Sequence, residues 1–172
     1  MLVINNKTEW MRIAAECNFF GTEEFIWIDF GIFHVFNNDI LLFNQCIKDL
    51  TLKNVKPVEP LESLKFEQSY VRIAGCWNTT TTICHPSLES IFTNISWYFA
   101  GGVFGGDKKS LITFANLTKE KCISIISTRN HLMWEVNIWY LVFLDLLSEN
   151  NHSELVIDWY HADHNSSIIA NF

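Results

Sequence analysis

The chain has 172 residues, a formal net charge of −7 at pH 7, 49% hydrophobic residues and 15% aromatic residues. This length and apolar content predict one globular domain over residues 1–172 and exclude a disordered chain. Because the net charge is negative and the longest basic run is Lys108-Lys109, we expect no nucleic-acid partner.

Cysteine spacing and hydropathy indicate the compartment. The five cysteines form no pair at the spacing of a metal site or a redox motif. The first ten residues lack a basic region followed by an apolar run, so we expect no signal peptide, and the apolar stretch 136–147 is too short to span a bilayer. Six Asn-X-Ser/Thr triplets match the acceptor pattern of N-glycosylation, but the missing secretory signal argues against their use. These features predict a cytoplasmic protein with reduced thiols and no membrane span.

The first half of the chain shows helical and strand patterns in turn. Residues 8–17 place apolar side chains on one helical face, and residues 25–28 form an apolar run typical of a buried strand. A second helix is predicted over 40–50, and two prolines interrupt regular structure at 53–60. Residues 69–77 read as a second strand. Helix followed at once by strand is typical of the α/β class.

The second half continues this alternation. Residues 86–94 favour at most a short helix, and residues 95–99 read as an aromatic strand. Two long helices are predicted over 108–127 and 131–147, the second mostly buried. The last predicted strand covers 155–160.

A carboxylate follows the first strand, in the sequence Trp27-Ile28-Asp29-Phe30-Gly31. An ionised side chain inside a buried strand carries a large desolvation cost, so Asp29 is expected at the carboxyl end of the strand, where open α/β sheets bind ligands. Gly31 would let the chain turn or a ligand approach the backbone closely. A plain strand end, with Asp29 capping a turn, accounts for the spacing equally well.

Two glycine pairs, Gly101-Gly102 and Gly105-Gly106, lie between the aromatic segment and Asp107, which is a good cap for the long helix. Glycines at a strand-to-helix junction let backbone N–H groups face a ligand, and a helix N-terminus favours an anionic group. The pattern matches neither a Walker loop nor a dinucleotide fingerprint. Tight packing of the junction is the alternative interpretation.

Two further positions carry titratable side chains. Glu135 lies near the start of the second long helix, where the helix macrodipole favours any acid, so its position supports a catalytic role only weakly. The last strand leads into Asp158, His161, Asp163 and His164. Because imidazole and carboxylate groups bind divalent metals and transfer protons, this cluster fits a metal site, an acid–base site or a solvated turn.

These stretches, in this order, resemble the HtrL/YibB-like glycosyltransferase family, which has relatives in giant viruses and a GT-A type of fold. The similarity is most specific at Trp27-Ile28-Asp29-Phe30-Gly31 and at Ala-Gly-Gly-Val-Phe-Gly-Gly, residues 100–106. The resemblance implies a single-domain open mixed sheet flanked by helices, lacking much of the first nucleotide-binding βαβ unit. The similarity spans nearly the whole chain and also covers residues 5–11, 18–20, 134–139 and 162–165.

The resemblance implies a metal-dependent transferase that moves a sugar from a nucleoside-diphosphate donor to a hydroxyl group of a glycan or protein acceptor. Asp29 matches the metal-binding acid, with His164 or His161 completing the shell of Mn²⁺ or Mg²⁺. Gly31 stands where many GT-A enzymes have a second Asp, and Glu135 would bind the acceptor hydroxyl or act as the base. Donor and acceptor would lie against Trp27, Gly31, Gly101, Gly102, Gly105, Gly106, Trp134 and Asn137.

A metal on Asp and His would neutralise a leaving diphosphate and a carboxylate would deprotonate the acceptor, so the chemistry agrees with the transferase that the resemblance implies. Two other hypotheses remain open. The missing second Asp and the short N-terminal part instead favour a non-catalytic glycosyltransferase-like module that binds carbohydrate or protein. A metal-dependent phosphohydrolase is the third hypothesis, although it gives the glycine loop no role. A shortened sheet would also expose an edge that favours a homo-oligomer.

Overall fold

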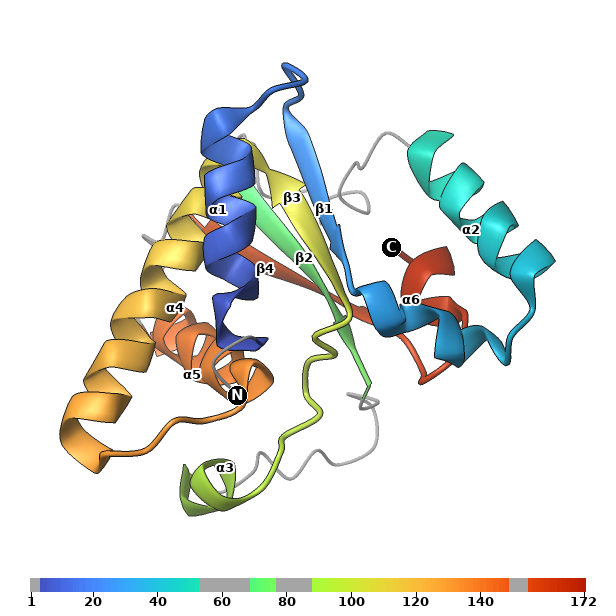
Figure 1. The fold of residues 1–172 in the computed structure, drawn as a ribbon. Helices are drawn as coiled ribbons and strands as arrows, with labels where there is room; N and C mark the ends of the chain where they lie inside the picture. The colour runs from blue at the N-terminus through green and yellow to red at the C-terminus, as the bar shows by residue number, and fades with distance from the viewer. Residues whose placement is uncertain (1–3, 53–68, 77–87, 149–154) are drawn as a thin grey trace.

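The computed structural model describes residues 4–52, 69–76, 88–148 and 155–172, which form an open, mixed four-stranded sheet flanked by helices (Figure 1). This architecture confirms the predicted fold class. The strand order is β1-β3-β2-β4; β3 runs antiparallel to β1 and β2, and β4 runs parallel to β2. The strands are β1 (Glu24–Ile28), β2 (Ser69–Gly75), β3 (Val103–Asp107) and β4 (Leu155–His161).

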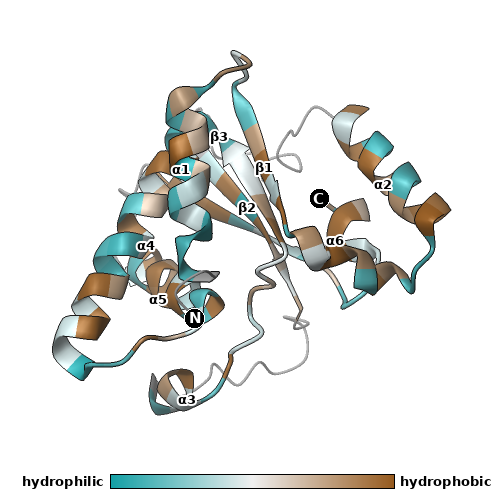
Figure 2. Cartoon of the chain, viewed as in Figure 1, coloured by the Kyte–Doolittle hydropathy of each residue, from teal (hydrophilic) through white to brown (hydrophobic). Residues whose placement is uncertain are grey.

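Helices cover both faces of the sheet. Figure 1 shows α1, α4 and α5 gathered on one side, while α2 and α6 lie together on the other. Figure 2 shows hydrophobic and hydrophilic positions alternating along α4, as expected for a helix with one face on the core. The helices are α1 (Lys7–Cys17), α2 (Ile40–Leu52), α3 (Leu88–Thr93), α4 (Lys108–Arg129), α5 (Glu135–Ser148) and α6 (Ser167–Ala170), with 3-10 segments η1 (Ile4–Asn6) and η2 (Phe30–Phe36).

Two hydrophobic clusters lie on opposite faces of the sheet, because successive side chains of a strand point to opposite faces. In β2, Val71 and Ile73 belong to the cluster that also contains Phe114 of α4 and Trp139 of α5. Ala74 belongs to the other cluster, formed mainly with residues of η2, α2 and α6. The sheet is therefore covered on both sides.

The strand predicted at residues 95–99 is wrong. Residues 95–102 form turns and irregular backbone, and the strand begins later, at Val103. It includes Gly105 and Gly106, which pack tightly against the neighbouring strands: a Cβ on Gly105 would lie 2.6 Å from the carbonyl oxygen of Phe25. Gly105 and Gly106 thus allow the strands to pack closely. Tight packing was the alternative interpretation of this glycine pair.

The other predicted elements are confirmed, with shifted ends. The second long helix begins at Glu135, because residues 131–134 are not helical. The predicted connection at 53–60 lies outside the described residues. None of the described helices is long and apolar enough to cross a membrane.

Candidate functional site: a tryptophan-lined cavity with a buried lysine

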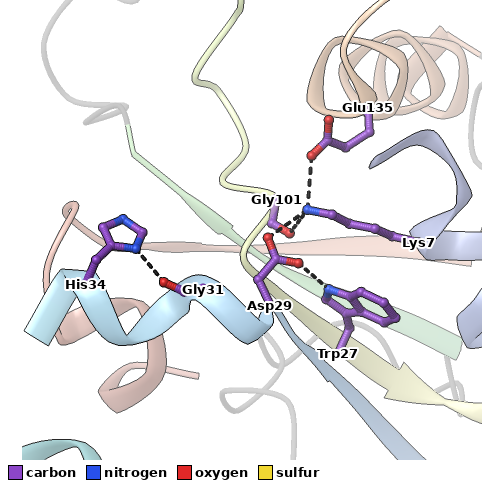
Figure 3. A network of polar contacts seen from close by, with 7 residues as sticks. All are labelled: Lys7, Trp27, Asp29, Gly31, His34, Gly101 and Glu135. Atoms are coloured by element: carbon purple, nitrogen blue, oxygen red, sulfur yellow. Dashed lines mark hydrogen bonds and ion pairs between the residues drawn. The ribbon is translucent and has the colours of Figure 1, made fainter. Parts of the chain in front are cut away.

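A cavity of about 590 Å³ lies where the end of β1 meets the first residues of α1 and α5. The loop that precedes β3 forms another part of its wall and contributes Gly101 and Gly102. Three charged residues line the cavity at this junction: Lys7, Asp29 and Glu135. Figure 3 shows that these side chains come from different elements and point toward one another.

Lys7 is the centre of this group. Its Nζ donates hydrogen bonds to Asp29 Oδ2 at 2.8 Å, to the carbonyl oxygen of Gly101 at 3.1 Å and to Glu135 Oε1 at 3.2 Å (Figure 3). An ammonium group has three N–H donors, so all of them are used. Lys7 and Glu135 are each only 7% exposed. Because a buried charge needs a partner, the lysine and the two carboxylates hold one another in place, with one negative charge in excess.

Asp29 lies directly after β1, as predicted from the sequence. Its second oxygen, Oδ1, accepts a hydrogen bond of 2.6 Å from the indole Nε1 of Trp27. The Asp29 side chain makes no capping hydrogen bond to η2, although the residue precedes that segment. The interpretation of Asp29 as a turn cap is therefore wrong, and its carboxylate belongs to the cavity.

The two glycine pairs lie in different places. Gly101 and Gly102 line the cavity, and a Cβ on Gly101 would lie 2.7 Å from Glu135 Oε1, so a larger residue here would displace that carboxylate. Gly105 and Gly106 lie within β3 and are not part of the cavity wall. The N-terminus of α4 follows the far end of β3, where the side chain of Asp107 caps it. That helix end therefore does not supply an anion site here.

Aromatic side chains form much of the wall. Four of the seven tryptophans contribute, and Trp97 and Trp134 are 48% and 40% exposed. Trp10 stacks on Trp27 with ring centroids 6.0 Å apart, and Trp27 in turn stacks on Phe104 of the core at 6.1 Å. This stack fixes the indole that binds Asp29, while the exposed tryptophans are accessible to a ligand.

The two histidines predicted as metal ligands do not both line the cavity. His164 lines the cavity, whereas His161 does not, and His161 Nε2 lies 3.9 Å from Asp163 Oδ1. The imidazole of His164 instead faces His34 of η2, which was not predicted. Gly31 also lines the cavity, and its carbonyl oxygen accepts a hydrogen bond from His34 Nδ1 (Figure 3).

Asn137 lies outside the cavity wall, although the resemblance places it against the substrate. It is 1% exposed, and its Nδ2 donates to the carbonyl oxygens of Ile91 and Asn94 at 2.6 and 2.8 Å. Its Oδ1 accepts a hydrogen bond from the backbone N–H of Ser96 at 2.7 Å. Asn137 thus fixes the segment that presents Trp97 to the cavity.

The residues that sequence reasoning missed are Lys7, Trp10, His34 and Trp97. Lys7 carried a usable signal, because a lysine in the first turn of a helix opposes the helix macrodipole. A cation at that position is expected to have an acidic partner elsewhere in the fold. His34 has no comparable local signal, since its partner is 130 residues away in the sequence.

The acidic and sulfur groups constrain the chemistry of the cavity. In the part of the chain that the structure describes, no group of three or more His, Cys, Asp or Glu side chains is arranged to hold a metal ion. A divalent ion on Asp29 would also lie beside the Lys7 ammonium, so the Mn²⁺ or Mg²⁺ site stays a prediction. Burial, with the nearby charge of Asp163, raises the pKa of the Cys76 thiol in the cavity wall, which argues against a nucleophilic cysteine.

Comparisons with known proteins give no assignment: no family model, curated protein or solved structure matches the chain. The resemblance to a glycosyltransferase family therefore stays a prediction. The function has to be inferred from the cavity and its side chains.

Proposed function

We propose that the cavity binds the sugar of a nucleoside-diphosphate donor and that the protein transfers this sugar to a hydroxyl group of a glycan or protein. The observation that carries the proposal is the set of four tryptophans around two carboxylates. Sugar rings have apolar C–H faces that pack against aromatic rings. Their hydroxyl groups donate hydrogen bonds to carboxylate oxygens. The cavity volume lies within the range of small-molecule sites, about 300–1,000 Å³.

Glu135 is the proposed general base. A base must lie within hydrogen-bond reach of the proton that it removes, and Glu135 lies at the wall of the cavity. Lys7 contacts its Oε1, so the other carboxylate oxygen would take the proton of the acceptor hydroxyl. Lys7 acts as a positioning residue that holds Glu135 and Asp29 in a fixed arrangement before the substrate binds.

A divalent ion, Mn²⁺ or Mg²⁺, belongs to this proposal. When bound, it would neutralise the negative charge that develops on the leaving diphosphate. Asp29 is the proposed protein ligand, with 32% of its side chain exposed, and His164 lines the same cavity. Because Lys7 already pairs with Asp29, we expect the ion to bind weakly until the donor diphosphate supplies further oxygen ligands.

The proposal extends to compartment and assembly. Cys17, Cys76 and Cys122 are free thiols, as expected for a cytoplasmic protein. Strands β1 and β4 are the two edges of the described sheet. An edge strand carries unpaired backbone groups that pair readily with a second chain, which supports a homo-oligomer.

Calorimetric titration tests donor binding. The wild type is titrated with UDP and with GDP, each with and without Mn²⁺, and so are Asp29→Asn and the matched control Asp49→Asn, which changes an exposed residue of α2. We expect one nucleotide to bind only with the metal, the Asp29→Asn variant to lose this binding, and the control to keep it. Absence of binding by the wild type to any nucleoside diphosphate with metal would refute the proposal.

Turnover is tested separately with Glu135→Gln. If Glu135 is the base, the variant binds the donor like the wild type but releases no nucleoside diphosphate in the presence of acceptors. Equal turnover of both proteins would exclude this role. Release of inorganic phosphate without an acceptor would instead support a phosphohydrolase.

A non-catalytic sugar-binding module is the second candidate. All three N–H groups of Lys7 are engaged inside the protein, an arrangement also typical of a purely structural ion pair. This candidate predicts sugar binding that quenches tryptophan fluorescence but needs neither nucleotide nor metal. The titrations above separate the two candidates, because only the transferase requires the nucleoside diphosphate.

A further inference from the structure

Two histidines meet at the cavity with their Nε2 atoms 3.3 Å apart: His34 of η2 and His164 of the segment that follows β4. We propose that this pair binds a transition-metal ion of the Zn²⁺, Co²⁺ or Ni²⁺ type. The inference goes beyond the proposed function, because it requires neither a nucleotide nor Asp29.

The hydrogen bonding of His34 prepares one ligand atom. Its Nδ1 lies 2.5 Å from the carbonyl oxygen of Gly31, and a carbonyl oxygen can only accept. The proton of neutral His34 therefore belongs to Nδ1, which leaves a lone pair on Nε2, the atom that faces His164. Metal-binding histidines characteristically donate their other ring N–H in this way, which fixes both tautomer and ring orientation.

The backbone on both sides of the pair is anchored. Next to His34, Val35 and Phe36 are buried in the core, at 5% and 2% exposure. Near His164, the N–H of fully buried Ala162 donates to the carbonyl oxygen of Gly75, and the N–H of Asp163 donates to Ser167 Oγ. Both imidazoles are exposed, so an ion can reach them from solvent.

The geometry of the rings matches two ligands of one ion. Two imidazole nitrogens bound tetrahedrally to Zn²⁺ at about 2.0–2.1 Å lie about 3.3–3.4 Å apart, with ring centres about 5.1 Å apart. The pair has 3.3 Å between Nε2 atoms and 5.1 Å between ring centroids. Rings joined by a straight N–H···N hydrogen bond of the same length would have centres about 5.6 Å apart. The shorter centroid distance shows that the two rings are bent relative to each other across the contact, as two ligands of one ion would also be.

The donor set selects the metal. Imidazole nitrogen favours Zn²⁺, Ni²⁺ and Cu²⁺, whereas Mg²⁺ and Mn²⁺ favour carboxylate and carbonyl oxygen. Among the described residues no third His, Cys, Asp or Glu joins the pair in a metal-binding group. Water or a ligand in the cavity would fill the remaining positions, at least one more than in a catalytic zinc site with three protein ligands.

The test is calorimetric titration of the whole chain with Zn²⁺, Ni²⁺ and Mg²⁺, with circular dichroism to verify folding. Variants His34→Gln and His164→Gln are compared with the matched control His161→Gln, an exposed histidine outside the cavity wall. We expect one Zn²⁺ per chain, binding at least about tenfold weaker in either test variant, unchanged binding in the control, and no comparable binding of Mg²⁺. Wild-type Co²⁺ protein should show the visible absorption of a four-coordinate ion.

Three results would overturn the site. The first is unchanged Zn²⁺ affinity in both test variants. The second is loss of binding in Cys76→Ser with both histidine variants unaffected, because that would place the ion on the thiol. The third is equal loss in His161→Gln. None of these results depends on nucleotide binding, so failure of this site and failure of the transferase proposal are distinguishable.

Discussion

Replacing Lys7 with methionine takes away the ammonium group that contacts Asp29 and Glu135 and keeps an unbranched side chain of similar length. The side chains of Lys7 and Glu135 are each 9% exposed, whereas that of Asp29 is 32% exposed. Removing one partner of a buried ion pair costs about 3–5 kcal/mol, because a buried charge is left without compensation. The more exposed Asp29 adds at most about 1 kcal/mol. We therefore expect Lys7→Met to lower the free energy of unfolding by about 3 kcal/mol, mainly through Glu135.

Urea denaturation followed by circular dichroism measures this change. For an unfolding slope of about 1–3 kcal/mol per M, the midpoint falls by at least about 1 M. Lys48→Met, at an exposed position of α2, is the control and should stay within about 0.5 kcal/mol of the wild type. The double variant Lys7→Met/Glu135→Gln should recover most of the loss, because its remaining side chain at 135 is neutral. The reasoning fails if Lys7→Met costs less than about 1 kcal/mol, or if the double variant is no more stable than Lys7→Met.

Two further predictions concern packing and pH. Gly101→Ala should cost about 1–3 kcal/mol in urea denaturation, because the new methyl group meets Glu135 Oε1 and overpacks the site. Gly102→Ala is the comparison and should cost less, since its methyl group meets the terminal methyl group of Ile32, whereas an ion pair with Lys7 holds the Glu135 carboxylate; equal losses would contradict this. Burial, with nearby acidic charges, raises the pKa of Tyr70 to about 12, so stability should fall between about pH 10, where an unfolded tyrosine titrates, and about pH 12. Urea midpoints across this range should fall less in Tyr70→Phe, and a rise with pH would refute the assignment.

Local patterns predicted the elements that periodicity and capping control. The apolar run before Asp29 placed a strand and its acid correctly, because burying a carboxylate within the strand is costly. The segment 95–99 misled the prediction, since aromatic residues favour strands and glycines disfavour them. Here close packing of β3 between its neighbours prevails over propensity, and β3 contains Gly105 and Gly106.

The candidate site was predictable only in part. Asp29, Trp27, Glu135, Trp134 and His164 line one cavity, since each lies at the end or start of a recognisable element, and their roles in binding and catalysis stay predictions. Lys7 and His34 were missed because their partners are distant in sequence: Lys7 is 128 residues from Glu135, and His34 is 130 residues from His164. Such pairs depend on the three-dimensional packing of the sheet and helices, which single-sequence periodicity does not encode.

The long sequence separation within the Lys7 group affects how the protein is made. Lys7 finds its acceptors 22, 94 and 128 residues later, at Asp29, Gly101 and Glu135. A ribosome synthesises the N-terminal end first, at about 5–20 residues per second. For several seconds, therefore, α1 is present while the first turn of α5 does not yet exist, and Lys7 must stay hydrated. The cavity consequently forms late in biosynthesis, only after α5 and the segment with His164 have been made.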